Sequence, residues 1–401
     1  MAEIIRPAVP RPIRIRRNAH TADPNILNFY EQAIREMKLA RLSGNPSSIA
    51  SPVSWRYQAA IHAYTRGSDP NADASDLPLP SDQSTFWIQC EHGSWLFLPW
   101  HRMYLHYFEM IVLSHVVRLG GPTDWALPYW NYSNPGQSTL PPAFQNPLPP
   151  GTSAPVNPNR DQQGRTRLDV VITGQSTHFA AGTSAVSFGA GITVGTVTVT
   201  DATHLTAQIS ISMAAALGGR TVTVTTGSEV VSLVNSFTVA NHLFISARDP
   251  DANAGGTRFV EPRPPGALPP FDITAAMRLT AFENAGGTAG FGGSSAEGGS
   301  LEGTPHGSMH VRTAGGPAGF MFDFVKVGLD PIFWLHHCNI DRLWKAWLRQ
   351  GGGRANPTNG TWLSASFPFH DASGQRADLT VRQVIDTRAE PLSYVYDDEP
   401  V

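Results

Sequence analysis

The sequence predicts a mainly α-helical protein with long loops, whose helical part is interrupted by a small antiparallel β-sandwich. Three features support this prediction. Apolar side chains recur at helical spacing towards both ends of the chain, residues 165–240 alternate as strands do, and Pro- and Gly-rich stretches separate these segments. With 401 residues, of which 41% are hydrophobic and 15% charged, the chain is long and apolar enough to form a large packed core.

Helices are expected on both sides of the strand-like segment. Residues 25–43 place apolar side chains such as Ile26 and Phe29 on one side, and Ser54 is suited to cap a helix that begins with WRYQAAIHAY. Pro99 fits the first position of a third helix. Asp330 and Pro331 are a strong start signal for a fourth helix, which should end near residue 349 before three glycines.

Residues 165–240 are predicted to form a β-rich, immunoglobulin-like insert. They contain only six charged residues, and runs such as ITVGTVTVT, LTAQISIS and RTVTVTT alternate between apolar and polar side chains. This divides the helical domain into a first part, residues 1–164, and a second part, residues 241–401. We expect the insert to be a solubilising addition rather than a cover for a site or a partner-binding module.

Composition excludes several functional classes. The net charge is -3 and no stripe of Lys and Arg interleaves with aromatic residues, so no nucleic-acid partner is expected. The apolar runs are shorter than the roughly 20 residues that span a bilayer, so no membrane partner is expected. The first 30 residues hold no apolar leader and the chain has two cysteines, which predicts a cytoplasmic protein.

Histidines cluster in three segments. Residues 90–109 read CEHGSWLFLPWHRMYLHYFE, residues 302–310 read EGTPHGSMH, and residues 330–344 read DPIFWLHHCNIDRLW, while His62 lies on the helix before the first segment. A single buried histidine is usually a structural residue, but burying several imidazoles without partners is costly unless they bind a metal. Imidazole donors without a carboxylate at ligand spacing, and without HExxH or CxxC motifs, leave copper or zinc.

These segments closely resemble the two copper-site signatures of type-3 copper proteins, the family of tyrosinases, catechol oxidases and haemocyanins. The resemblance implies a four-helix bundle core that holds a dicopper centre. It implies His62, His92 and His101 as ligands of the first copper ion, and His306, His310 and His337 as ligands of the second. His336 should lie outside the ligand set, because adjacent helical residues point about 100° apart.

The resemblance extends to residues around the copper ligands. It implies a thioether between Cys90 and His92, although an ordinary free thiol is the alternative. It implies that Glu302 holds a water near the copper ions and that Phe324 stacks over the second copper. Tyr394 and Tyr396 resemble the tyrosine pair that closes plant-type catalytic domains, with Arg16 or Arg17 packed nearby. Asp341 is expected to orient a neighbouring group or to be solvated or paired with Arg342.

The function implied is oxidation of o-diphenols (catechols) to o-quinones with O2. Gly307 stands where many tyrosinases carry Asn, which places monophenol hydroxylation in question. The alternatives are a true tyrosinase, an o-aminophenol oxidase and a haemocyanin-like O2 carrier. A carrier is disfavoured because only five residues follow Tyr396, too few for a covering β domain. The expected partners are a small phenol and O2, with a copper-loading protein and the oligomeric state left open.

Overall fold

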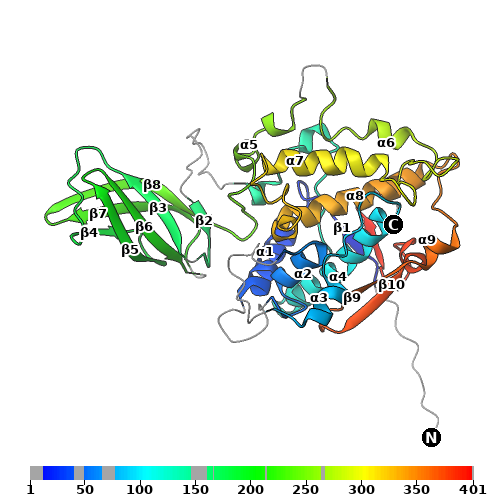
Figure 1. The fold of residues 1–401 in the computed structure, drawn as a ribbon, viewed down its shortest axis with the longest axis horizontal. Coiled ribbons are helices and arrows are strands. Elements are labelled where there is room, and N and C mark those ends of the chain that lie inside the picture. The colour runs from blue at the N-terminus through cyan, green and yellow to red at the C-terminus, as the bar shows by residue number, and fades with distance from the viewer. Residues whose placement is uncertain are drawn as a thin grey trace, which may run out of the picture. The chain divides into compact units, whose positions relative to one another are not determined.

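The chain folds into two compact units. The computed structural model describes residues 12–39, 49–65, 77–145, 160–165, 167–212, 215–262 and 267–399. One unit is Met1–Pro141 with Thr257–Val401, and the other is Pro142–Gly256 (Figure 1). The predicted insert boundaries, 165 and 240, therefore both fall inside the second unit.

The first unit is mainly helical, as predicted. Its helices are α1 (Pro24–Leu39), α2 (Trp55–His62), α3 (Pro80–Phe86), α4 (Phe97–Arg118), η3 (Pro135–Gln137), η5 (Arg258–Val260), α6 (Thr274–Arg278), η6 (Glu302–Gly307), α7 (Ser308–Ala314), η7 (Val327–Leu329), α8 (Pro331–Arg349), α9 (Gly360–Ser364) and α10 (Val381–Val384). Its strands are β1 (Arg14–Arg16), β9 (Ser366–His370), β10 (Arg376–Thr380) and β11 (Tyr394–Tyr396). Strand β1 pairs with β11 in parallel, and β9 pairs with β10 antiparallel.

Local sequence signals explain where the main helices begin. The Ser54 side chain accepts a hydrogen bond from the Tyr57 amide, and the Asp330 side chain accepts one from the Ile332 amide, so both predicted N-caps are confirmed. Helix α4 begins at Phe97, two residues before the start predicted at Pro99. Pro99 still lies in the first turn, where a residue without an amide hydrogen is tolerated. Helix α1 covers 24–39 of the predicted 25–43, and residues 40–43 lie outside the described residues.

His306 and His310 do not lie on one regular helix. Residues 302–307 form a π-type turn that contains a non-helical residue, Thr304, with φ −139° and ψ 123°. The residue before a proline is pushed towards extended backbone, and Pro305 has no amide hydrogen for a regular helix. Regular helix resumes only at Ser308, so His306 and His310 come from two joined elements.

The second unit is built from two small sheets. Its elements are η4 (Pro142–Phe144), β2 (Arg160–Gln162), β3 (Leu168–Thr173), β4 (Ser184–Ser187), β5 (Ile192–Asp201), β6 (His204–Ile211), β7 (Gly218–Thr226), β8 (Glu229–Ala240) and α5 (Pro250–Asn253). The sheet orders are β2-β8-β7-β4 and β3-β6-β5. The three strand-like runs of the sequence correspond to β5, β6 and β7, so their assignment as strands is confirmed.

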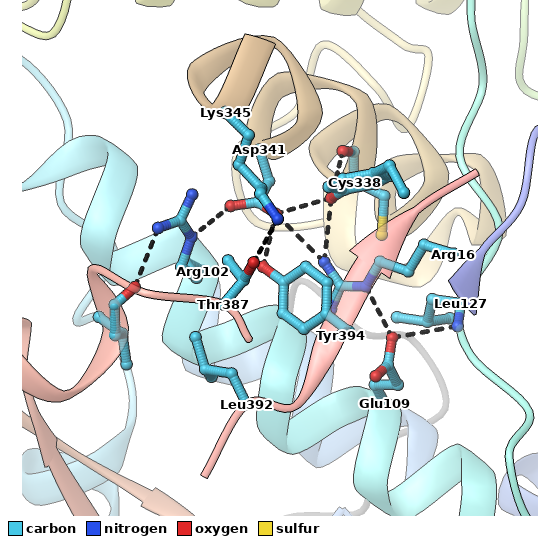
Figure 2. A network of polar contacts seen from close by, with 12 residues as sticks. Arg16, Arg102, Glu109, Leu127, Cys338, Asp341, Lys345, Thr387, Leu392 and Tyr394 are labelled. Carbon is cyan, nitrogen blue, oxygen red and sulfur yellow. Dashed lines mark hydrogen bonds and ion pairs between the residues drawn. The ribbon is translucent and has the colours of Figure 1, made fainter. Parts of the chain in front are cut away.

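A buried ionic network ties the first unit together around α4 and α8 (Figure 2). Glu109 of α4 accepts hydrogen bonds from Arg14 and Arg16 of β1, at 3.0 and 2.8 Å. Asp341 of α8 lies 2.5 Å from Arg102 Nε and 3.3 Å from Arg16 Nη1. All five side chains are at most 4% exposed, so each charge is neutralised by another buried charge and not by solvent.

The C-terminal strand completes this network. The hydroxyls of Tyr394 and Tyr396 each donate to Asp341 at 2.6 Å, and the Arg16 guanidinium lies 3.7 Å from the centre of the Tyr394 ring. Of the two arginines expected near the tyrosine pair, Arg16 is therefore the one that packs there. Of the three alternatives for Asp341, solvation and pairing with Arg342 are wrong, because the side chain is 4% exposed and Arg342 pairs with Asp398 at 2.8 Å.

Glu109→Gln should destabilise the protein by about 3–5 kcal/mol at pH 7, because Arg14 and Arg16 would lose their shared counter-charge in a dry environment. Burial raises the pKa of Glu109, but Arg16 and Arg14 hold it below its usual range. The carboxylate therefore contributes stability above its unfolded pKa of about 4.3, and this contribution is lost as the pH falls.

Urea unfolding at several pH values measures this effect. The difference between wild type and Glu109→Gln should shrink as the pH falls below about 4. Asp398→Asn, which breaks a partly exposed pair whose side chains are 14% and 33% exposed, is the control and should cost less than about 1 kcal/mol. Equal losses in the two variants would contradict the role given to the buried charges.

Candidate metal centre

The first group of potential metal ligands gathers at the N-terminal end of α4. It consists of His62 at the last position of α2, Cys90 and His92 in the segment before α4, and His101 in the first turns of α4. One donor atom from each lies within 4.8 Å of the others. The ring centres are 5.5 Å apart for His62 and His92 and 5.1 Å apart for His92 and His101.

The second group comes from η6, α7 and α8. It contains His306, His310, His336 and His337, with donor atoms again within 4.8 Å of one another. The ring centres are 4.7 Å apart for His306 and His310 and 5.0 Å apart for His306 and His337. The six histidines predicted as ligands thus all lie in these two groups, three in each.

The two groups face each other and form one centre. The rings of His101 and His337 stack with their centres 4.3 Å apart and their planes 7° apart, and His92 lies 5.5 Å from His306. Helices α4 and α8, which carry the stacked pair, pack against each other in the core (Figure 1). Two metal ions held by these groups would therefore be neighbours.

Backbone carbonyls orient four of the imidazoles. Nδ1 of each ring lies 2.8–3.1 Å from a carbonyl oxygen: His62 from Phe324, His101 from Phe97, His306 from Glu302 and His310 from Met321. A carbonyl can only accept a hydrogen bond, so Nδ1 carries the proton and Nε2 keeps its lone pair. Metal-binding histidines commonly show this arrangement, because the second bond fixes the ring and its tautomer.

Burial keeps the imidazoles neutral. It lowers the pKa of His62, His101, His306 and His337 well below the usual value, and neighbouring imidazoles lower it further. Burial also lowers the pKa of His92 and His310 to about 4. At neutral pH the site therefore offers uncharged nitrogen donors without first releasing protons.

The donor set fits a pair of metal ions. Nε2 of His306 and Nδ1 of His337 are buried without a hydrogen-bond partner in the described part of the chain. A buried polar atom left unpaired costs free energy, and coordination of a metal ion removes that cost. Imidazole-rich sites of this kind suit copper or zinc.

His336, which was predicted to lie outside the ligand set, lies beside the predicted ligands of the second group. It is fully buried, its ring centre is 4.6 Å from that of His310, and both of its nitrogens lack a hydrogen-bond partner among the described residues. The 100° offset from His337 turns it towards His306 and His310 and not out of the group. No carbonyl orients it, which distinguishes it from the four imidazoles described above.

Cys90 lies where the thioether prediction requires it. Its Sγ is 3.2 Å from His92 Nδ1 and 3.4 Å from His101 Nε2. Burial, together with the nearby charges of Glu91 and Glu302, raises the pKa of the thiol well above its usual value. The distance permits a bond to the His92 ring but does not decide between the thioether and a free thiol.

Glu302 is held at the edge of the centre by two glycines. Its Oε1 accepts a hydrogen bond from the Gly93 amide at 2.8 Å, and Gly93 has a φ of +68° that favours glycine. A Cβ at Gly298 would lie 2.4 Å from Oε2, so that position must also be small. Burial raises the pKa of Glu302 to about 6, against the opposing effect of the Gly93 hydrogen bond.

Phe324 packs against the first group, which corrects the prediction that it stacks over the second copper. Its ring centre lies 4.7 Å from that of His62 and 4.7 Å from that of His92. The hydrogen bond between His62 Nδ1 and the Phe324 carbonyl oxygen fixes this position. It is a tertiary contact, which the position of Phe324 in the sequence does not reveal. The ring remains 51% exposed, so it forms part of the rim of the centre.

Gly307 lies between His306 and His310, and a Cβ there would meet only the Glu302 carbonyl oxygen, at 3.5 Å. Its φ of −60° and ψ of −37° are open to any residue.

Among the residues that the structure describes, no helix combines the length and apolar character needed to cross a membrane.

Curated relatives resemble the chain over almost its whole length. A tyrosinase of Hahella sp. (strain CCB-MM4) is 31% identical over 398 residues, which cover 96% of this chain and 63% of the relative. A chloroplastic polyphenol oxidase of Malus domestica is 26% identical over 97% of this chain and 49% of the relative. The chain therefore spans about half to two-thirds of the length of these relatives.

Solved structures share the fold. Latent apple tyrosinase superposes with a TM-score of 0.56 at 22% identity, over 98% of this chain and 64% of that chain. An active aurone synthase superposes with a TM-score of 0.57 at 19% identity, over 97% of this chain and 86% of that chain. At these identities the superpositions establish a common fold and leave the substrate open.

The relatives correct the predicted cytoplasmic location. The polyphenol oxidases of Malus domestica and Solanum lycopersicum and a catechol oxidase of Solanum tuberosum are chloroplastic. These plant relatives are chloroplastic, so the inference of a cytoplasmic protein from the first 30 residues and the cysteine number was wrong. The location of a protein depends on a targeting segment that the import machinery recognises, and this segment is independent of the fold.

Two family models match the chain. The common central domain of tyrosinase matches residues 52–350, and the polyphenol oxidase middle domain matches residues 356–401. The first match contains all six histidines of the two facing trios, and the second contains the tyrosine pair that binds Asp341. The chain therefore belongs to the tyrosinase and polyphenol oxidase family of type-3 copper proteins.

Proposed function

We propose that this protein is a dicopper oxidase that uses O2 to convert o-diphenols into o-quinones. The observation that carries the proposal is the pair of facing trios of neutral, buried imidazoles. His62, His92 and His101 would hold one copper ion, and His306, His310 and His337 the other. When bound, the copper pair supplies the binding of O2 and the transfer of electrons from the phenol.

The chain's own residues would bind and deprotonate the substrate. Phe324 offers an exposed ring against which a phenol can stack, beside His62 and His92. With a pKa of about 6, Glu302 is mostly ionised at pH 7 and can take up a proton from a bound water or phenol. Overall, two catechols lose two protons and two electrons each, and one O2 becomes two waters.

The finer architecture also belongs to this proposal. Helices α2, α4, α7 and α8, with the η6 turn, would form the four-helix bundle that holds the copper ions, since the two histidine groups come from these elements and the segment before α4. The sheets of the second unit would pack as a β-sandwich. A single cluster supports this packing, because it contains Leu205 and Ile209 of one sheet and Val224 and Phe237 of the other.

Purified protein should bind about two copper ions per chain and oxidise catechol in proportion to its copper content. Hydrogen peroxide added to the copper-loaded protein should produce a strong near-ultraviolet absorption band. His337→Ala, which removes one donor of the second trio, should abolish both the band and turnover. Catechol oxidation by copper-free protein would refute the proposal, and a peroxide band without turnover would favour an O2 carrier.

Gly307→Asn should raise the rate of monophenol hydroxylation relative to catechol oxidation, by roughly tenfold if the new amide helps Glu302 orient a proton-accepting water. The site has room for the side chain, because a Cβ at Gly307 meets only one atom within 4 Å. Steady-state rates with tyrosine and catechol measure the ratio.

The matched control is Gly303→Asn, a glycine of the same turn whose Cβ would meet nothing within 4 Å. It should leave the ratio unchanged. A ratio that stays constant in Gly307→Asn, or that rises equally in both variants, contradicts the role assigned to this position.

The intact mass of active protein should fall short of the sequence mass by about two hydrogen atoms if Cys90 is joined to His92, because the thiol and the ring each lose one. Cys90→Ser should restore the sequence mass. Cys338→Ser is the control, since the second cysteine is fully buried in α8 and should leave the deficit in place. A wild-type protein without any mass deficit shows that Cys90 is a free thiol.

A further inference from the structure

A direct ion pair links helices α4 and α8 next to their metal-binding histidines. Arg102 immediately follows His101 on α4, and Asp341 lies one turn after His337 on α8. Arg102 Nε and Asp341 Oδ1 are 2.5 Å apart, and the two side chains are 0% and 4% exposed. One turn away, His101 and His337 stack at 4.3 Å, so the ion pair lies beside the contact between the two histidine groups.

The surroundings of Arg102 fix its position in several directions. Its Nη1 donates to the Val384 carbonyl at 2.9 Å, and its guanidinium lies 3.6 Å from the centre of the Trp344 ring. Asp341 is held in turn by Arg16 and by both tyrosine hydroxyls. Figure 2 shows Arg102 and Arg16 reaching Asp341 from two directions (Figure 2).

A buried ion pair of this kind contributes little net stability, because desolvating both charges offsets their attraction. Its directional hydrogen bonds do, however, permit only one alignment of the two helices. Apolar side chains alone would tolerate small shifts of α4 along α8. Such a shift would change the separation of the His101 and His337 nitrogens and therefore of the two metal sites.

We infer that Arg102 and Asp341 are positioning residues that set the register of α4 against α8 and thereby the separation of the two copper ions. This inference rests on the proposed dicopper function. Neither side chain touches the substrate or a metal in this role. They act through the helices that carry His101 and His337.

Arg102→Met is the informative variant, because it removes the link to α4 while Asp341 keeps Arg16 and both tyrosines as partners. Arg14→Met is a closely matched control. Arg14 is also a buried arginine that binds one carboxylate, Glu109, and one carbonyl, that of Leu392 at 2.8 Å, but it does not link α4 to α8. Glu109 likewise keeps Arg16 in that control.

Copper analysis, electron paramagnetic resonance of the oxidised protein, the near-ultraviolet band with hydrogen peroxide and steady-state kinetics are measured on all variants. Arg102→Met should still bind two copper ions. It should show a paramagnetic signal that the spin-coupled wild-type pair lacks, a weaker peroxide band and a kcat lower by about 10- to 100-fold with little change in KM. Arg14→Met should keep the wild-type spectra and kcat.

The inference is overturned if Arg102→Met keeps the wild-type spectra and kcat, or if Arg14→Met loses them equally, since the effect would then be general destabilisation. If Arg102→Met does not fold, Arg102→Lys decides. It keeps the charge but lacks the planar fork, so it should show the same spectral changes in a milder form, and wild-type spectra would overturn the inference. A wild-type protein that binds no copper pair refutes the proposed function instead.

Discussion

The first unit is organised around one constraint: several uncharged imidazoles are buried face to face, and their lone pairs have few protein partners. In four of them Nδ1 donates a hydrogen bond to a backbone carbonyl, which leaves Nε2 directed at neighbouring rings. Such an arrangement is unfavourable in a dry interior unless a cation occupies the space between the nitrogens. The fold therefore has to supply the free energy that holds these rings together before a metal arrives.

That support comes from neighbouring positions on the same helices. Helix α4 carries His101 next to Arg102 and, two turns on, Glu109, while α8 carries His337 one turn before Asp341. Strands β1 and β11 bring Arg16 and Tyr394 from the two ends of the described chain to these carboxylates. Because every charge in this set is compensated inside the protein, removing one member affects all the elements that it joins.

Local signals in the sequence predicted much of this arrangement, and tertiary contacts account for what they missed. Ser54 and Asp330 mark helix starts through hydrogen bonds within one turn, and the resemblance of the histidine segments to copper-site signatures indicated all six rings. The turn at Thr304 follows from the neighbouring Pro305, whereas the ring of Phe324 on His62 and the orientation of His336 depend on segments that are distant in sequence. The partners of Asp341 could not be predicted either, since nothing near it in the sequence points to Arg102 or Tyr394.

The buried core and the exposed rim of the centre differ in how firmly their side chains are held. This difference bears on how substrate choice can vary. His101, His337 and the ionic network are buried, so their geometry tolerates little change. At the rim, Phe324 is half-exposed, Gly307 has open space around it, and Glu302 is fixed through one backbone hydrogen bond. Under the proposed function, substitutions at the rim would alter which phenol is bound and how its proton is removed while the metal-holding scaffold stays unchanged.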